Sequence, residues 1–472
     1  MEKKNVWETY DAGQLAELEQ LNAEYRDFLD NGKTERECID NIVNTVEAAG
    51  YQELEAVIKN GGSLKKGDKV YSVWMNKAIV MFRMGEKPLT DGMNILGAHI
   101  DSPRLDIKQN PLYEDGGFAY LDTHYYGGVK KYQWVTIPLA IHGVVVKKDG
   151  TTVEINIGEK EEDPVFFISD LLIHLSQEQL EKKAAKVIEG EALDIIVGNK
   201  PLVIDKQEEG KETKSAGKDA VKTGVLNILK ENYDIEEADF ISAELEVVPA
   251  GKAREAGFDR SIILAYGQDD RVCAFTSLKA MLDTDVCERT TCCILVDKEE
   301  IGSVGATGMR SRFFENAVAE VMNLTGEYSE LNMRRCLARC CMLSSDVSSA
   351  FDPSFAGSFD KKNVAILGGG MVFNKFTGSR GKSGSNDANA EYLAHLRNIL
   401  EEKDVHFQTA ELGKVDLGGG GTIAYILALY GMNVIDSGVA VMNMHAPWEA
   451  TSKADVYEAY RGYKAFVEGA SL

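Results

Sequence analysis

The chain has 472 residues, which allows two or three domains, and its composition of 44% apolar and 27% charged residues is that of a globular protein. Its formal net charge of −23 disfavours binding to nucleic acid or to an anionic membrane. No apolar stretch approaches the ~18 residues that a membrane span needs, and the first residues lack the apolar core of a secretory signal. We therefore expect a cytoplasmic protein with neither a nucleic-acid nor a membrane partner.

The eight cysteines form no Cys-x-x-Cys pair. Cys292 and Cys293 are adjacent in an apolar, strand-like run, where neighbouring side chains point to opposite faces. Reduced, buried thiols of a cytosolic protein explain this usage. A zinc site made of cysteines is not expected.

The first hundred residues predict two helices followed by strands. Apolar side chains recur at helical spacing over residues 11–49, and Asn31-Gly32 interrupts the pattern. Residues 70–100 change to the character of strands that lead to His99. This order of elements is typical of an α/β domain.

A β-rich pattern follows in the middle of the chain. Residues from about 106 to 160 are rich in Tyr, Val and Ile, and a hairpin is predicted over 144–155 because an Asp-Gly pair supplies its tight turn. A helix is predicted over 168–188. The stretch 206–222, rich in Lys, Glu and Gly, is predicted to be a mobile exposed loop.

Four apolar runs end at polar residues that can bind metal. The runs cover residues 93–98, 292–296, 341–343 and 439–442, and the polar residues that follow them are His99, Asp101, Glu299, Glu300, Asp346 and His445. Each run predicts a buried strand, and the carboxyl ends of α/β strands meet at one crevice. Asp269 lies at the start of a helix predicted to extend to Leu282. With His99, His445, Asp346 and one of the two glutamates it makes a set of two histidines and three carboxylates, which suits a pair of zinc ions.

Each of these residues has an ordinary structural explanation when it is taken alone. Asp269 and Asp346 suit helix N-caps, Glu299-Glu300 suits a solvated acidic turn, and His445 suits a core position. Together they would be five unrelated coincidences at the ends of consecutive elements. The combination therefore favours a metal site.

The spacing of two pairs also suggests chemical roles. His99 and Asp101 are two residues apart, so both side chains can point the same way from a strand end, and Asp101 can orient the imidazole. Glu299 and Glu300 repel one another, and a metal ion offsets that repulsion. Because adjacent side chains diverge, one glutamate can bind metal while the other acts as general base.

A run of glycines precedes a helix predicted over residues 423–429. Its backbone either approaches a ligand near the helix N-terminus or forms a flexible loop. The run is not a Walker loop, because no Lys-Ser/Thr pair follows it. Gly419 and Gly420 are candidate substrate-binding residues.

The metal-ligand candidates fall in two blocks separated by the β-rich region. This distribution predicts one α/β catalytic domain, residues 1–105 and 255–472, with a mixed sheet flanked by helices. A β-rich domain, residues 106–254, is predicted to be inserted into it.

These motifs resemble those of a known family. The order His99-x-Asp101, Asp269-Asp270-Arg271, Glu299-Glu300-Ile301-Gly302, Asp346 and Met444-His445 is similar to that of the aspartyl aminopeptidase / aminopeptidase I family of dinuclear zinc aminopeptidases. The similarity extends over essentially the whole chain. It implies removal of single residues from the N-termini of peptides.

The resemblance also implies a role for each site residue. Two divalent ions, expected to be zinc with cobalt or manganese as alternatives, would be bound by His99, Asp269, Glu300, Asp346 and His445. Asp101 would orient His99, and Glu299 would be the general base. Asp269 would bridge the ions, and its bond to Asp270 would be cis.

Family resemblance further implies homododecamers in which the inserted domain forms dimer contacts. His174 lies in a segment similar to one that carries a histidine in the family, and it binds metal, contacts a neighbouring subunit's site or packs internally. Lys375 is a candidate to bind a substrate carboxylate. The stretch 447–450 departs from the branch specific for acidic residues, so the preferred N-terminal residue, acidic or apolar, stays open.

Two other functions are compatible with the sequence. One is a different metal-dependent amidohydrolase or carboxypeptidase on the same core. The other is an inactive oligomeric scaffold, which the complete ligand set disfavours.

Overall fold

The structure is a computed structural model that describes residues 5–204, 214–215 and 217–471. Its contacts divide the chain into two compact units. The first unit comprises Met1–Ser102, Ala253–Met444 and Trp448–Leu472, and the second comprises Pro103–Lys252 and His445–Pro447. The domain boundaries expected from the sequence, after residues 105 and 254, lie next to Ser102 and Lys252.

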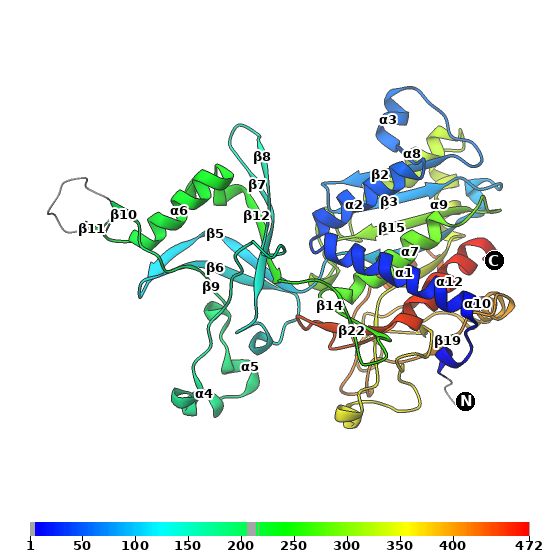
Figure 1. Ribbon diagram of the computed structural model, residues 1–472. Coiled ribbons are helices and arrows are strands. Elements are labelled where there is room, and N and C mark those ends of the chain that lie inside the picture. Colours follow the sequence, from blue (N-terminus) through cyan, green and yellow to red (C-terminus); the bar gives the residue numbers. More distant parts are fainter. Residues whose placement is uncertain (1–4, 205–213, 216, 472) are drawn as a thin grey trace. The chain divides into compact units, whose positions relative to one another are not determined.

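A mixed nine-stranded sheet forms the centre of the first unit (Figure 1). Its strands, in spatial order, are β1 (Gln52–Glu53), β2 (Lys69–Trp74), β3 (Ala78–Arg83), β15 (Thr290–Val296), β4 (Met93–His99), β16 (Cys341–Ser345), β20 (Asn433–Gly438), β18 (Met371–Asn374) and β19 (Phe407–Thr409). The four strands β15, β4, β16 and β20 are parallel, whereas β3 runs antiparallel to both of its neighbours and β18 runs antiparallel to β20 and parallel to β19. The predicted mixed α/β sheet is confirmed.

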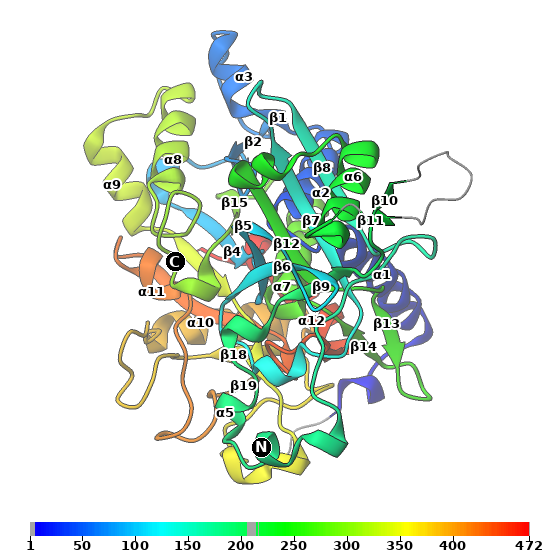
Figure 2. The same cartoon turned by 90° about the vertical axis from the view of Figure 1, so that its left-hand side faces the viewer.

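Helices cover both faces of this sheet (Figure 2). One apolar core holds residues of α1 (Ala12–Asn31), α2 (Glu35–Ala48), α7 (Gln268–Leu282), α10 (Ala390–Glu402) and α12 (Lys453–Gly469). The other core holds residues of α3 (Leu54–Lys59), α8 (Phe313–Leu324), α9 (Glu330–Ala338) and α11 (Ala424–Ala428). Cys293 belongs to the first core and Cys292 to the second, as the alternation of a strand requires.

The two helices predicted over residues 11–49 are α1 and α2. Each begins with a capping box, from Asp11 and Gln14 in α1 and from Thr34 and Glu37 in α2. These reciprocal hydrogen bonds satisfy backbone N–H groups that the first helical turn leaves without partners. The start of each helix is therefore encoded locally.

A smaller five-stranded sheet and four 3-10 helices complete the first unit. The sheet contains β13 (Arg254–Ala256), β14 (Ile262–Ala265), β22 (Glu449–Ser452), β21 (Ala440–Met442) and β17 (Ser348–Ser349). The 3-10 helices are η1 (Val6–Glu8), η2 (Leu89–Asp91), η7 (Glu299–Ile301) and η8 (Pro353–Ser358). Strand β14 precedes α7 directly, and β22 precedes α12, so this sheet fixes where both helices start.

An antiparallel six-stranded sheet forms the second unit. Its order is β8 (Thr152–Ile157), β7 (Leu139–Val146), β12 (Ala243–Pro249), β5 (Arg104–Asp115), β6 (Phe118–Tyr126) and β9 (Ile195–Gly198). The predicted hairpin is present as β7 and β8, with Gly150 at a φ of +87° in the turn. The remaining elements are β10 (Val203–Ile204), β11 (Lys214–Ser215), α6 (Ala220–Tyr233), η3 (Lys131–Gln133), η5 (Gly190–Ala192) and η6 (Glu237–Ser242).

The predicted continuous helix over 168–188 is wrong. The structure has three short helices there, η4 (Ile173–Leu175), α4 (Gln177–Leu180) and α5 (Ala184–Val187). Leu172, Ile173 and Leu175 are exposed, so the segment has no apolar face packed against a core that would hold one long helix.

Two further predictions concern loops. Most of the predicted loop over 206–222 lies outside the described residues, and the described remainder forms β11, a turn and the start of α6. The predicted helix over 423–429 is shorter, because α11 covers only Ala424–Ala428. Within the described part of the chain, no helix has both the length and the apolar character that crossing a membrane requires.

Candidate metal centre

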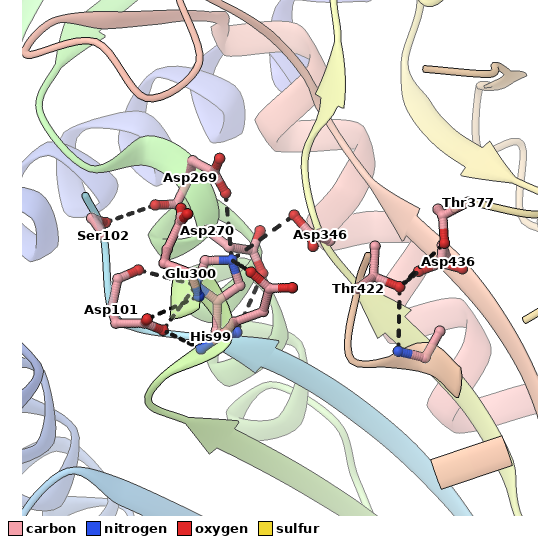
Figure 3. A network of polar contacts seen from close by, with 12 residues as sticks. His99, Asp101, Ser102, Asp269, Asp270, Glu300, Asp346, Thr377, Thr422 and Asp436 are labelled. Atoms are coloured by element: carbon pink, nitrogen blue, oxygen red, sulfur yellow. Dashed lines mark hydrogen bonds and ion pairs between the residues drawn. The ribbon is translucent and has the colours of Figure 1, made fainter. Parts of the chain in front are cut away.

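Three neighbouring parallel strands lead to the predicted ligands. Strand β4 ends at His99 and lies between β15 and β16. The chain continues from β15 to Glu299 and Glu300 in η7, and from β16 to Asp346. Parallel strands bring their carboxyl ends to one edge, and Figure 3 shows these side chains pointing toward one another there.

His99 is at the centre of this cluster. It is only 1% exposed, and its Nε2 lies 3.4 Å from Asp269 Oδ1 and 3.9 Å from Asp346 Oδ1. That nitrogen has no hydrogen-bond partner of good geometry among the described residues. His99, Asp269 and Asp346 each offer a ligand atom within 4.8 Å of the others. A buried imidazole nitrogen aimed at two carboxylates fits a metal ion.

Asp101 organises the residues around His99. The backbone carbonyl oxygen of Asp101 lies 3.0 Å from His99 Nδ1, and on one side its carboxylate lies 3.3 Å from the same nitrogen. On the other side its two oxygens accept hydrogen bonds of 3.1 Å from the backbone N–H groups of Glu299 and Glu300. Lys298, just before this turn, has a φ of +69°, which turns the chain sharply. The sequence pattern did not reveal that Asp101 also holds the glutamate turn.

Hydrogen bonds from its backbone groups to two other side chains hold Asp269 at the start of α7. The Asp269–Asp270 peptide bond is cis, as the resemblance implies. The N–H of Asp269 donates to Glu449 Oε2 at 3.0 Å, and its carbonyl oxygen accepts from Ser102 Oγ at 2.7 Å. Glu449 is 1% exposed and lies in β22, so this hydrogen bond connects the five-stranded sheet to the site. Neither Glu449 nor Ser102 was identified from the sequence, because neither follows a ligand motif.

The electrostatics of the cluster favour a cation. Burial raises the pKa of Asp346 well above its usual value, and the nearby Glu299 and Asp269 raise it further. Burial alone would lower the pKa of His99, but the carboxylates of Asp101 and Asp269 beside its ring nitrogens raise it well above its usual value. Carboxylates crowded in a buried site repel one another, and a divalent ion between them relieves that repulsion.

The other proposed ligands differ in their surroundings. Glu300 lies in the first unit, beside Glu299. His445 follows β21 in the sequence, but its contacts group it with the second unit, where its Nδ1 lies 2.9 Å from the carbonyl oxygen of Gly128. His174 is also in the second unit and is exposed on η4.

The candidate substrate-binding residues lie in two loops of the first unit. Lys375 follows β18, and its Nζ lies 3.6 Å from Asp387 Oδ1. Gly419 and Gly420 lie in the glycine run before α11, where the carbonyl oxygen of Gly420 accepts a 2.6 Å hydrogen bond from Gly378 N. The structure thus places these glycines against the loop that follows Lys375.

Comparison with known proteins places this arrangement in a family. Residues 28–467 match the family described as aminopeptidase I zinc metalloprotease (M18). A probable M18 family aminopeptidase 1 of Clostridium acetobutylicum is 59% identical over 466 residues, which cover 99% of this chain and 98% of that protein. A protein of the same name from Thermotoga maritima is 46% identical, covering 99% of each chain.

Solved structures agree with this match. The crystal structure of aminopeptidase I from Clostridium acetobutylicum superposes with a TM-score of 0.90 at 58% identity, covering 99% of both chains. An M18 aminopeptidase from Thermotoga maritima superposes with a TM-score of 0.92 at 45% identity, covering 100% of both chains. The chain therefore belongs to the aminopeptidase I (M18) family of zinc metalloproteases and is a zinc-dependent aminopeptidase.

Proposed function

We propose that the enzyme removes N-terminal residues from peptides with two divalent ions per chain and with Glu299 as general base. The observation that carries this proposal is the convergence of Asp269, Asp346 and Glu299 on one buried imidazole. Glu299 Oε2 lies 3.9 Å from His99 Nε2, so the proposed base is beside the proposed ligands. Zinc is the expected metal, and cobalt or manganese suits the same donor atoms.

The ligands divide into two sets that share one residue. His99 and Asp346 would bind one ion, Glu300 and His445 the other, and Asp269 would bridge both. The proximity of His99, Asp269 and Asp346 supports the first set. The hydrogen bond from Glu300 N to Asp101 supports the second, because it anchors Glu300 beside the same cluster.

Bound metal ions would polarise the scissile carbonyl and lower the pKa of the attacking water toward about 7. Glu299 would take the proton from that water and return it to the amine that leaves. Asp101 would keep Glu299 in place through its backbone N–H and would hold the imidazole of His99 in one orientation. The chain thus supplies a fixed base and rigid ligands.

A blocked peptide tests the function directly. An aminopeptidase requires the free amine, so the purified enzyme should cleave a leucine-initiated tetrapeptide and leave its N-acetylated twin uncut. The products of the free peptide, separated by liquid chromatography, should be leucine and the tripeptide. Equal cleavage of both peptides would identify another amidohydrolase, and release of the C-terminal residue would identify a carboxypeptidase. An intact free peptide in zinc-loaded protein would support the scaffold.

We further propose a homododecamer built from dimers, with the second unit forming dimer contacts. An aminopeptidase 1 of yeast has been solved as a dodecamer, and its fold matches this chain with a TM-score of 0.74 at 20% identity. Leu172, Ile173 and Leu175 of the second unit are more than half exposed, which suits a surface that another copy covers. His174, between them, would then reach a neighbouring copy's site rather than bind metal in its own chain.

The substrate side and the location are also proposals. Lys375 with Gly419 and Gly420 would contact the peptide, and Lys375, half exposed, would meet a carboxylate. A cytoplasmic location is supported by the cysteines, none of which forms a disulfide in the described part of the chain.

A further inference from the structure

Asp436 is a buried carboxylate beside the metal centre that the proposed chemistry does not use. It is 0% exposed and lies in β20, opposite Ser344 of β16 on one side and Asn374 of β18 on the other. Strand β16 continues to Asp346, and β18 continues to the loop that begins at Lys375. Asp436 therefore lies between a strand that leads to a metal ligand and a strand that leads to the substrate loop.

Thr422 connects Asp436 to both glycine-rich loops. Its Oγ1 donates a hydrogen bond to Asp436 Oδ1 and accepts one of 3.3 Å from Ala424 N at the start of α11. Thr377 Oγ1 lies 3.5 Å from Thr422 Oγ1. The only hydroxyl hydrogen of Thr422 is committed to Asp436, so Thr377 is the donor in this second contact. Figure 3 shows the side chains of Thr377, Thr422 and Asp436 grouped together.

No other described group holds this carboxylate. Asp436 Oδ2 has no hydrogen-bond partner among the described residues. Burial raises the pKa of Asp436 to about 7, and the nearby Glu299 also raises it, while the hydrogen bond from Thr422 lowers it. Burying a carboxylate for packing alone is unfavourable. The role of Asp436 is therefore its hydrogen bond with Thr422, the one side chain that donates to it among the described residues.

The two loops joined by Thr422 lie against one another. Gly378 N donates to the carbonyl oxygen of Gly420 at 2.6 Å, and a Cβ at position 419 would clash with Gly378 O. The two loops, together with residues 411–415, line an open pocket of about 350 Å³, whose lining includes Phe376, Thr377, Gly378, Leu412, Gly418 and Gly419. The position of one loop therefore sets the position of the other and the width of the pocket.

We propose that Asp436 is a positioning residue that fixes both glycine-rich loops, residues 375–387 and 416–422, through the hydroxyl of Thr422, so that the peptide is presented to the metal centre in one pose. This inference rests on the proposed function of the site. Asp436 does not touch the reacting atoms. It acts through Thr422, which carries the constraint to Thr377 and to the first turn of α11.

Removing the hydroxyl of Thr422 should loosen the loops without loss of metal. For Thr422→Val we expect kcat/KM on the free tetrapeptide to fall about ten-fold, mainly through KM, with an unchanged metal content. Amide hydrogen exchange of residues 376–385 and 416–422 should become at least ten-fold faster in the zinc-loaded enzyme. Thr422→Ser keeps the hydroxyl donor, and Asp436→Asn keeps an oxygen acceptor. Both variants should have values of kcat/KM and of loop exchange much closer to wild type than those of Thr422→Val.

Thr284→Val is a matched control, because Thr284 is buried and its Oγ1 also makes a hydrogen bond, to Ala280 O. It should lower the melting temperature without changing KM or loop exchange. If Thr422→Val lowers the melting temperature as Thr284→Val does but leaves KM and loop exchange at wild-type values, the proposal is wrong.

A second variant covers the case in which Thr422→Val does not fold. Thr377→Val changes a partly exposed loop residue and should raise KM about three-fold with faster exchange in both loops. Wild-type kinetics and exchange in that variant would overturn the proposal. If the wild-type enzyme leaves the free peptide intact, the proposed function fails, whereas the exchange measurements still decide whether Asp436 and Thr422 hold the loops.

Discussion

At Asp101, one buried carboxylate serves three neighbours. It lies against the imidazole of His99 and also fixes the backbone of Glu299 and Glu300, so that a proposed ligand and the proposed base depend on the same group. The spacing of His99 and Asp101 in a strand predicts the first contact, because residues two apart share a face. The second contact joins residues 198 and 199 positions apart in the sequence, and no local pattern encodes it.

Glu299→Gln tests the division of roles between the two glutamates. Glutamine keeps the size and the hydrogen bond from the backbone to Asp101 but cannot accept a proton from water. We expect kcat to fall by about 10²–10⁴, the usual contribution of a general base, while metal analysis of the variant shows wild-type content. Glu300→Gln is the matched control and should lose metal. Wild-type turnover of Glu299→Gln would assign the base to another residue.

The cysteines give a prediction about pH at the same scale. Cys287 is partly exposed, and burial raises the pKa of its thiol to about 11, while the other seven cysteines are buried. A raised pKa leaves about one thiolate in a thousand at pH 8, and the thiolate is the reactive form. In the folded protein a thiol reagent should therefore react slowly with Cys287 alone, about ten-fold faster for each pH unit up to its pKa. Fast labelling of several cysteines at pH 8 would contradict this packing.

At the scale of elements, the glycine run before α11 depends on two close approaches of backbone. Gly419 has a φ of +115°, and an added Cβ would clash with Gly378 O. Gly421 has open space at the corresponding position. The sequence alone does not distinguish Gly419 from Gly421. The close approach at Gly419 comes from a loop about 40 residues earlier in the chain.

Gly419→Ala should therefore separate these two glycines. The strained φ and the clash should cost about 1–3 kcal/mol and displace the loop, which lowers kcat/KM on the free tetrapeptide. Gly421→Ala should change the free energy of unfolding by less than about 0.5 kcal/mol. Urea unfolding and steady-state kinetics of both variants check this. Equal behaviour of the two variants would mean that the loops do not pack as described.

Elements with a local signal were predictable from the sequence, and those that depend on distant partners were not. Apolar spacing predicted α1 and α2, and buried runs ending in polar residues pointed to His99 and Asp346 as candidates. The hydrogen bonds from Asp269 N to Glu449 and from Thr422 Oγ1 to Asp436 join elements that only the assembled sheets bring together. The segment after residue 168 failed as a helix because apolar spacing does not reveal whether a surface is there to cover it.

At the scale of the whole molecule, bound metal should stabilise the fold. Ligands that bind only the folded state raise its stability by mass action, and the buried carboxylates around His99 repel one another without a cation. We expect dialysis against a chelator to abolish activity and to lower the melting temperature. Zinc should restore both, to about two ions per chain by metal analysis. Full activity after complete metal removal would refute the zinc chemistry.

The first unit is interrupted in the sequence, and this delays the folding of its core while the chain is being synthesised. Its core needs β4 near the amino end and α12 at Lys453–Gly469, which packs against α1 and α7. A ribosome adding 5–20 residues per second takes roughly 10–40 s to proceed from Lys252 to α12. During that time nearly all of the second unit has left the ribosome and is free to fold. The apolar strand that leads to His99 still lacks the later strands and helices that cover it. We expect the nascent chain to depend on chaperones until its last helix leaves the ribosomal tunnel.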